Sequence, residues 1–324
     1  MEAFGIFEGG GAKGIAHIGA LKATEEHDID FVGLAGTSVG AIVASLVAAG
    51  YRADEIYDPE NEASLFKKDF LEFFPPADWQ RLQSVWKGAQ GAFYRKQNAC
   101  SLLWGVISFL LCHWRNLSRV RNEGGMLRTE EFEQWLNDIL ARRLRTANAD
   151  FEPSGENGYV TFQDLPLPLK VISADVTRQR LRVYSMPHDA RVDVARAVGA
   201  SISIPFIFSP KHSGGINYVD GGIVSNFPAW VFDDERKRAP PLTPTLGFRL
   251  VQKSPIEENG HRQENGVFSI YSFISDVFQT AVFGDNTLER RDVATLHEIP
   301  LGVKIGPCDS PRLSDSGGPE FLRR

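Results

Sequence analysis

The chain has 324 residues, of which 43% are hydrophobic, so it can bury the core of one large α/β domain or of two smaller ones. Its 35 Lys and Arg residues against 41 Asp and Glu residues give a formal net charge of −6, which argues against a protein-wide grip on nucleic acid. Cys100, Cys112 and Cys308 lie far apart with no CxxC pair. We therefore expect no disulfide framework and no metal site, and a reducing compartment.

The first twenty residues do not have the pattern of a secretory signal, because Glu2, Glu8, Lys13 and His17 interrupt the apolar stretch. The longest strongly apolar run is residues 102–111. It is about half as long as the roughly 20 residues that a membrane-spanning helix needs. We therefore expect a cytoplasmic protein without a membrane-spanning helix.

The first two apolar runs each lead through a glycine-rich loop into a helical pattern. Residues 3–7 form the first run, and Gly-Gly-Gly-Ala-Lys-Gly at 9–14 forms its loop. Residues 31–35 form the second run, which passes through Gly-Thr-Ser-Val-Gly at 36–40 into a helix of small residues that Gly50 ends. Two successive strand–loop–helix units predict an α/β fold with a central, mostly parallel sheet flanked by helices.

A helical, aromatic and basic segment at about 51–128 interrupts this pattern, and we expect a lid-like insertion over the sheet. An N-capped amphipathic helix that begins after Thr129 should pack back on the core. Residues 150–157 are rich in Glu, Asn, Pro and Gly and predict a loop. The other expected elements are strands at 169–175, 181–185 and 245–250 and helices at 193–200 and 267–283.

The pattern of regular elements fades beyond Pro300. Residues 306–324 are rich in Pro, Gly, Ser and Asp with little apolar content, which predicts an irregular or disordered tail. We therefore expect a single domain over residues 1–305 that contains the insertion.

Ser38 lies between a predicted strand and a predicted helix, with Gly36 and Gly40 on either side. The glycines permit the tight turn that exposes a serine, and the helix N-terminus favours a developing negative charge. Such a serine is a candidate nucleophile for acyl transfer, which also requires a base and hydrogen-bond donors for the oxyanion. A glycine-lined turn with a capping serine is the alternative interpretation.

The glycine triplet at 9–11 offers successive backbone N–H groups at the start of a helix, which is typical of a nest for an anion or an oxyanion. With Gly14 it also satisfies the GxGxxG pattern of a dinucleotide site. That site requires an acidic residue at the end of the second strand, where this chain has Ala-Gly-Thr-Ser at 35–38. A dinucleotide-binding oxidoreductase is therefore the first alternative function.

Asp220 is the best candidate for the base, since none of the seven histidines lies in a context that resembles a catalytic triad. It ends a short apolar run and precedes two glycines, so its carboxylate is expected at a strand end near the edge of the sheet where such sites lie. By itself, Asp-Gly-Gly is more often only a turn.

Taken together, the glycine triplet, the GxSxG serine and the distant Asp-Gly-Gly resemble the patatin-like phospholipase family. The segments 201–208 and 220–228 also look like the family's segments around its catalytic aspartate, so the resemblance covers about residues 3–300. It implies a serine lipid acyl hydrolase that cleaves fatty-acyl esters of phospholipids or lysophospholipids through an acyl-enzyme intermediate. No cofactor and no metal are implied.

The resemblance also implies a Ser-Asp dyad and an oxyanion hole, made of Ser38 as nucleophile, Asp220 as its partner, and the backbone N–H groups of Gly9, Gly10 and Gly11. Lys13 matches the basic residue after the family's glycines, and it would order the loop or contact an anionic headgroup. Glu8 stands where the family commonly has an aspartate.

The apolar run at 102–111 is flanked by basic residues and tryptophans within residues 95–121. This composition suits peripheral adsorption to an anionic membrane, and it equally suits a lid helix buried against the protein's own core. The expected partners are a phospholipid or lysophospholipid substrate and, through residues 95–121, a membrane surface, with no nucleic acid. A lipid-binding module without catalysis is the second alternative function, and the sequence does not indicate an oligomeric state.

Overall fold

The computed structural model describes the ranges 1–10, 14–58, 60, 64–66, 114–238, 243–252 and 296–303. Within them the strands are β1 (Glu2–Phe7), β2 (Asp30–Thr37), β3 (Gly125–Leu127), β4 (Leu169–Asp175), β5 (Arg180–Ser185), β6 (Phe206–Phe208), β7 (Lys211–Ser213), β8 (Ile216–Asp220), β9 (Thr245–Gln252) and β10 (Leu296–Val303). The helices are α1 (Ile15–Glu26), α2 (Val39–Ala48), α3 (Ala53–Ile56), α6 (Trp114–Glu123), α7 (Glu130–Ala147), α8 (Val194–Ser201) and α9 (Asp233–Arg238), with the 3-10 turns η3 (Glu156–Gly158), η4 (Phe162–Asp164) and η5 (Gly221–Ile223).

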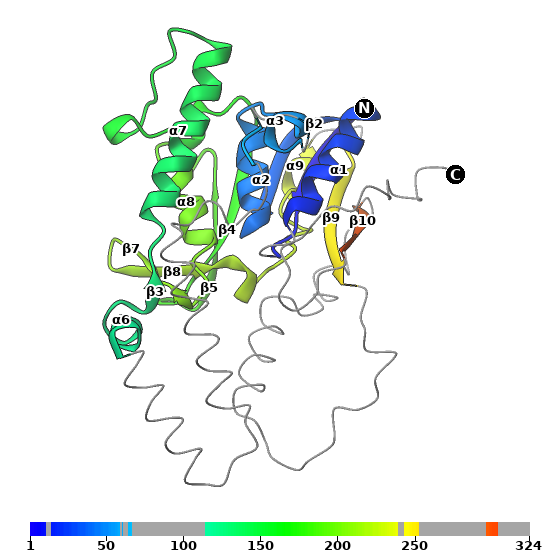
Figure 1. The fold of residues 1–324 in the computed structure, drawn as a ribbon. Helices are drawn as coiled ribbons and strands as arrows, with labels where there is room; N and C mark the ends of the chain where they lie inside the picture. Colours follow the sequence, from blue (N-terminus) through cyan, green and yellow to red (C-terminus); the bar gives the residue numbers. More distant parts are fainter. Residues whose placement is uncertain are drawn as a thin grey trace, which may run out of the picture.

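A single sheet with strand order β10-β9-β1-β2-β4-β8-β7 forms the centre of the described chain, and β5 also pairs with β4 (Figure 1). The strands β10, β9, β1, β2 and β4 run parallel to one another. At the other end, β5 and β8 run antiparallel to β4, and β7 runs antiparallel to β8. The predicted α/β fold with a mostly parallel sheet is therefore confirmed, and its antiparallel end is an addition to the prediction.

The sheet has a packed layer on each face. Residues of α1, α2, α7 and α8 share one large core on the first face (Figure 1). Side chains alternate along β1, so Phe7 lies in this core while Phe4 and Ile6 pack with Phe227 and Phe232 in a second core. The rings of Phe4 and Phe232 are stacked with centroids 4.4 Å apart. The central strands are thus packed between two layers.

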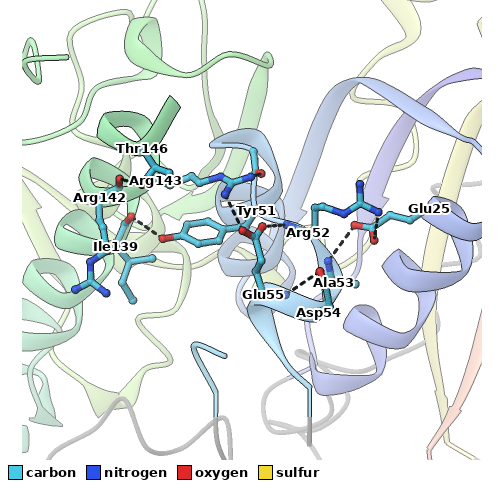
Figure 2. Close-up of polar contacts among 11 residues, drawn as sticks. Glu25, Tyr51, Arg52, Ala53, Asp54, Glu55, Ile139, Arg142, Arg143 and Thr146 are labelled. Atoms are coloured by element: carbon cyan, nitrogen blue, oxygen red, sulfur yellow. Dashed lines mark hydrogen bonds and ion pairs between the residues drawn. The ribbon is translucent and has the colours of Figure 1, made fainter. Parts of the chain in front are cut away.

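Polar contacts join α1, α3 and α7 at the surface of the first layer (Figure 2). Arg143 on α7 donates to Glu55 on α3 at 2.7 Å, and Glu25 on α1 accepts the N–H of Ala53 at 2.9 Å. The expectation that the helix after Thr129 packs back on the core is confirmed, because the apolar side of α7 is buried there. These contacts fix α7 relative to the first two strand–helix units.

Two helix ends test the local predictions. Gly50 follows α2 with a φ of 98°, a conformation that favours glycine, so the predicted helix end is confirmed. Thr129 precedes α7 as expected, but its side chain makes no capping bond to the helix backbone. Its hydroxyl donates instead to the carboxylate of Glu133 at 2.7 Å. The side-chain cap predicted at Thr129 was wrong.

The strand β10 is the main element that the sequence pattern did not indicate. It runs parallel to β9 at the edge of the described sheet, and Pro300 is paired with Arg249 inside it. Proline has no N–H to donate, which excludes it from a central strand but not from an edge strand. The strand begins at Leu296, before Pro300, and continues past it to Val303.

The predicted insertion at about 51–128 is described only at its two ends, which include α3 and α6. The apolar run at 102–111, the predicted helix at 267–283 and the predicted tail at 306–324 lie outside the described ranges. Among the helices that are described, none combines the length and the apolar character needed to cross a membrane.

Candidate active site

Ser38 occupies the sharp turn between β2 and α2. Its backbone has a φ of 52° and a ψ of −124°, a conformation that is strained for any residue other than glycine. Its side chain makes no capping bond to α2, so the interpretation of a capping serine is wrong. The Ser38 N–H donates to Ser201 Oγ at 2.9 Å, and that hydroxyl donates to the carbonyl of Ile172. The strained turn is thus held by α8 and β4.

The glycines on either side of Ser38 are required by close backbone contacts. A Cβ on Gly36 would lie 2.2 Å from the carbonyl oxygen of Gly40, and a Cβ on Gly40 would lie 2.2 Å from that of Phe7. No side chain fits at either distance. The GxSxG pattern therefore lets α2 start directly against the end of β1, where the glycine-rich loop begins.

Asp220 ends β8, and strand register brings it to Ser38. In the sheet, Thr37 on β2 is paired with Ile172 on β4, and the next residue of β4, Ser173, is paired with Asp220. Ser38 Oγ donates to Asp220 Oδ2 at 2.7 Å, and the N–H of Gly222 donates to Oδ1 at 2.7 Å. The two predicted residues therefore meet across β4, in a hydrogen bond that leaves the carboxylate fixed from both sides.

The environment of this pair favours proton transfer. Ser38 is 4% exposed and Asp220 is fully buried. Burial raises the pKa of Asp220 to about 6, against the opposing effect of the hydrogen bonds from Ser38 and Gly222. A carboxylate with this pKa is more basic than an ordinary aspartate and is still ionised at neutral pH. It can therefore accept the hydroxyl proton of Ser38.

The glycine-rich loop begins beside Ser38. A Cβ on Gly9 would lie 3.3 Å from Ser38 Cβ, while a Cβ on Gly10 would lie 2.1 Å from the side chain of Leu250. The N–H of Gly9 donates to the carbonyl oxygen of Asn226 at 3.0 Å. This differs from the expectation that Gly9 supplies a donor for an oxyanion, because its N–H is already bonded within the protein.

Gly11 and Lys13 lie outside the described ranges, so their predicted roles stay predictions. In the same ranges, no group of three or more His, Cys, Asp or Glu side chains lies close enough to hold a metal ion. The described site offers a serine hydroxyl, a buried carboxylate and main-chain N–H groups.

Three further side chains, to which the sequence pattern gave no role in catalysis, surround the start of the loop. Glu8 Oε2 accepts the N–H of Leu250 at 2.6 Å. Asn226 Nδ2 donates to the carbonyl oxygen of Gly9 at 3.1 Å. His17 is fully buried on α1, its Nε2 donates to the carbonyl oxygen of Glu8 at 2.8 Å, and burial lowers its pKa to about 4. Asn226 lies within the segment 220–228 that carried the family resemblance, and this was the only signal for it.

Known proteins are similar to this chain over most of its length. A family model described as Patatin-like phospholipase matches residues 5–233. The uncharacterized protein YqhO of Bacillus subtilis is 29% identical over 289 residues, which are 86% of this chain and 80% of YqhO. Lysophospholipase NTE1 of Yarrowia lipolytica is 25% identical over 225 residues, which are 69% of this chain and 11% of that protein. The crystal structure of VipD from Legionella pneumophila aligns with 94% of this chain and 63% of its own, at 17% identity and a TM-score of 0.41.

Proposed function

We propose that Ser38 and Asp220 form the catalytic dyad of this chain. The premise is that the chain belongs to the patatin-like phospholipase family and is a phospholipase-type ester hydrolase. The observation that carries this proposal is the 2.7 Å hydrogen bond from Ser38 Oγ to the buried carboxylate of Asp220. A serine is a poor nucleophile until a base holds its proton, and this geometry provides the base. The substrates are fatty-acyl esters of phospholipids or lysophospholipids.

Acylation begins when Ser38 Oγ attacks the ester carbonyl carbon and its proton passes to Asp220 Oδ2. The carbonyl oxygen becomes an oxyanion, for which we assign the N–H groups of Gly10 and Gly11 as donors, since the Gly9 N–H is bonded to Asn226. When the tetrahedral intermediate collapses, the bond to the alcohol breaks and the alcohol takes the proton from Asp220. The fatty acyl group is left on Ser38 as an ester.

Deacylation repeats these steps with water as the nucleophile. Water gives a proton to Asp220 and attacks the acyl carbon, and Ser38 Oγ leaves with that proton as the fatty acid departs. One carboxylate therefore serves as base and acid in both halves of the reaction. A pKa of about 6 suits both roles near neutral pH.

Apolar side chains beside the dyad support a fatty-acyl substrate. Ile223 and Val224 follow Asp220 within four residues, and they are 37% and 47% exposed, respectively. Phe206 is 66% exposed and lies three residues after Ser203, whose carbonyl oxygen accepts the Asp220 N–H at 2.9 Å. Exposed apolar groups that follow Asp220 and its main-chain partner Ser203 closely in the chain suit the binding of an acyl chain. Lys13 remains our candidate for an anionic headgroup, and residues 95–121 for a membrane surface.

The two alternatives explain less of this geometry. A dinucleotide-binding oxidoreductase would place an acidic residue for the ribose after β2, where this chain has Ser38 bonded to Asp220. A lipid-binding module without catalysis would have no use for a positive φ at Ser38 or for a buried carboxylate with a raised pKa. Both features cost stability, and nucleophilic catalysis is the function that requires them together.

The test uses a fluorophosphonate probe and the release of fatty acid from phospholipid vesicles. Wild-type protein should be labelled and active, Ser38→Ala should lose both labelling and hydrolysis, and Asp220→Asn should lose hydrolysis. Ser45→Ala is the matched control, because Ser45 is a buried serine within α2 whose hydroxyl, among the described residues, bonds to the carbonyl of Ile42 at 2.7 Å and not to the dyad. Labelling and hydrolysis that persist in Ser38→Ala would overturn the proposal.

A further inference from the structure

The segment after the Asp220 turn contacts both the nucleophile turn and the glycine-rich loop. Thr37 Oγ1 donates to the carbonyl oxygen of Ser225 at 3.0 Å, and the N–H of Gly9 donates to that of Asn226 at 3.0 Å. The N–H of Ser225 donates to the carbonyl of Gly221 at 2.8 Å, within the Asp220 turn. Residues 225 and 226 therefore link three stretches that lie far apart in the sequence.

The side chain of Asn226 adds a second bond to the loop. It is 2% exposed, and its Nδ2 donates to the carbonyl oxygen of Gly9 at 3.1 Å and to Glu8 Oε1 at 3.4 Å. Both partners are acceptors, so only the nitrogen of the amide can face them, and the orientation of the side chain is fixed. One residue thus holds Gly9 by its N–H and by its C=O.

The other amide atom, Oδ1, is held against the loop at a cost in stability. It is buried and has no hydrogen-bond partner among the described residues. A Cβ on Gly9 would lie 2.2 Å from it, so only glycine fits beneath it. A buried acceptor without a partner destabilises the folded state. The asparagine thus bonds the loop through Nδ2 while Oδ1 stays unpaired beside Gly9, so the side chain fixes the place of the loop without satisfying both of its own amide atoms.

We propose that Asn226 is a positioning residue that sets the glycine-rich loop against Ser38, so that the N–H of Gly10 can serve the oxyanion. The inference rests on the proposed function, since it assigns a role in the oxyanion hole. A donor displaced by about 1 Å can cost about 100-fold in rate. The oxyanion exists only in the transition state, so the loss should appear in kcat while KM stays near the wild-type value.

The test is Asn226→Asp, which keeps the shape of the side chain but turns a carboxylate oxygen toward the Gly9 carbonyl and the Glu8 carboxylate. Asn226→Ser is the second, uncharged variant, which is too short to reach Gly9 and serves if the first does not fold. Asn137→Asp is the matched control: Asn137 is also buried and binds main chain, with Nδ2 bonded to the Gly158 carbonyl at 3.2 Å and Oδ1 to the Val160 N–H at 2.8 Å. It lies on α7, and within the described ranges it bonds to neither the glycine-rich loop nor the dyad.

The measurement is kcat per active site on a soluble fatty-acyl ester, with sites counted by fluorophosphonate labelling. We expect kcat to fall about 100-fold in either Asn226 variant, with KM and the apparent pKa of the rate unchanged. Asn137→Asp should lower the thermal midpoint and leave kcat per labelled site unchanged. Wild-type kcat per site in a folded Asn226 variant would overturn the inference while leaving the dyad intact. Activity in Ser38→Ala would instead overturn the proposed function on which it rests.

Discussion

Replacing Asp220 by asparagine should abolish hydrolysis and also make the folded protein more stable at neutral pH. The asparagine Oδ1 can accept the N–H of Gly222, and its Nδ2 can donate to Ser38 Oγ, so both hydrogen bonds of the carboxylate have a replacement. The substitution therefore removes the buried negative charge and little else. An ionised aspartate at this position is a cost to stability that catalysis requires.

The size of this cost follows from the pKa. Burial raises the pKa of Asp220 from 3.8 to about 6, a difference of roughly two units, and each unit corresponds to 1.36 kcal/mol. Between these two values the folded state binds more protons than the unfolded state, so stability falls as the pH rises. The full cost, about 3 kcal/mol, is present above pH 6 and disappears below about pH 4.

The assay is denaturant unfolding of the wild type and Asp220→Asn at about pH 4 and about pH 8. The stability difference should be close to zero at the acid pH and should favour the variant by about 3 kcal/mol at the basic pH, which is about 4 °C in Tm for a chain of this length. The protonation of His17, whose pKa burial lowers to about 4, is common to both proteins and cancels. A variant that is less stable than the wild type at about pH 8, or a difference that does not change with pH, would refute the reasoning.

Three further predictions concern the same site. In a pH series, kcat/KM should fall about tenfold per pH unit below pH 6 and level off above it, since only ionised Asp220 accepts the serine proton. A kcat/KM that still rises above pH 8 would contradict this. Ser38→Gly and Ser38→Ala should both be inactive. Denaturant unfolding should show the glycine variant to be about 1 kcal/mol more stable than the alanine variant, because glycine adopts a φ of 52° without strain. Equal unfolding midpoints would argue against strain at this position. Gly40→Ala should destabilise the folded protein by more than about 3 kcal/mol, since the new Cβ would meet the Phe7 carbonyl at 2.2 Å. Gly19→Ala on α1 is the control: a Cβ there has no atom within 4 Å, and the substitution should stabilise the protein by about 0.5–1 kcal/mol. Similar thermal midpoints for the two variants would be inconsistent with the packing.

The parts of the fold that depend on local pattern could be predicted from the sequence. The apolar runs at 3–7 and 31–35 and the glycine-bounded turn at Ser38 correspond to β1, β2 and the start of α2. Each is set by residues that are neighbours in the chain. The strand β10 escaped this kind of prediction because Pro300 is tolerated only through its edge position, which depends on the order of strands.

The geometry of the site depends on contacts that no local pattern encodes. The hydrogen bond between Ser38 and Asp220 requires β2, β4 and β8 to pair in one register. The sequence pattern made Asp220 a candidate base and the family resemblance paired it with Ser38, but neither gave this register. The glycine triplet predicted three equivalent donors. The N–H of Gly9 is different because it bonds to Asn226, which is 217 residues away in the chain. This distinction becomes visible only in three dimensions.

The central claim, that Ser38 is acylated with Asp220 as its base, is tested most directly by trapping the intermediate. Wild-type protein would be mixed with a phospholipid that carries one isotopically labelled acyl chain, quenched in acid and digested for mass spectrometry. A Ser-Asp dyad predicts one labelled acyl group on the peptide that contains Ser38, with none in Ser38→Ala and far less in Asp220→Asn. Hydrolysis without an acylated Ser38 peptide, or a label on another residue, would contradict it.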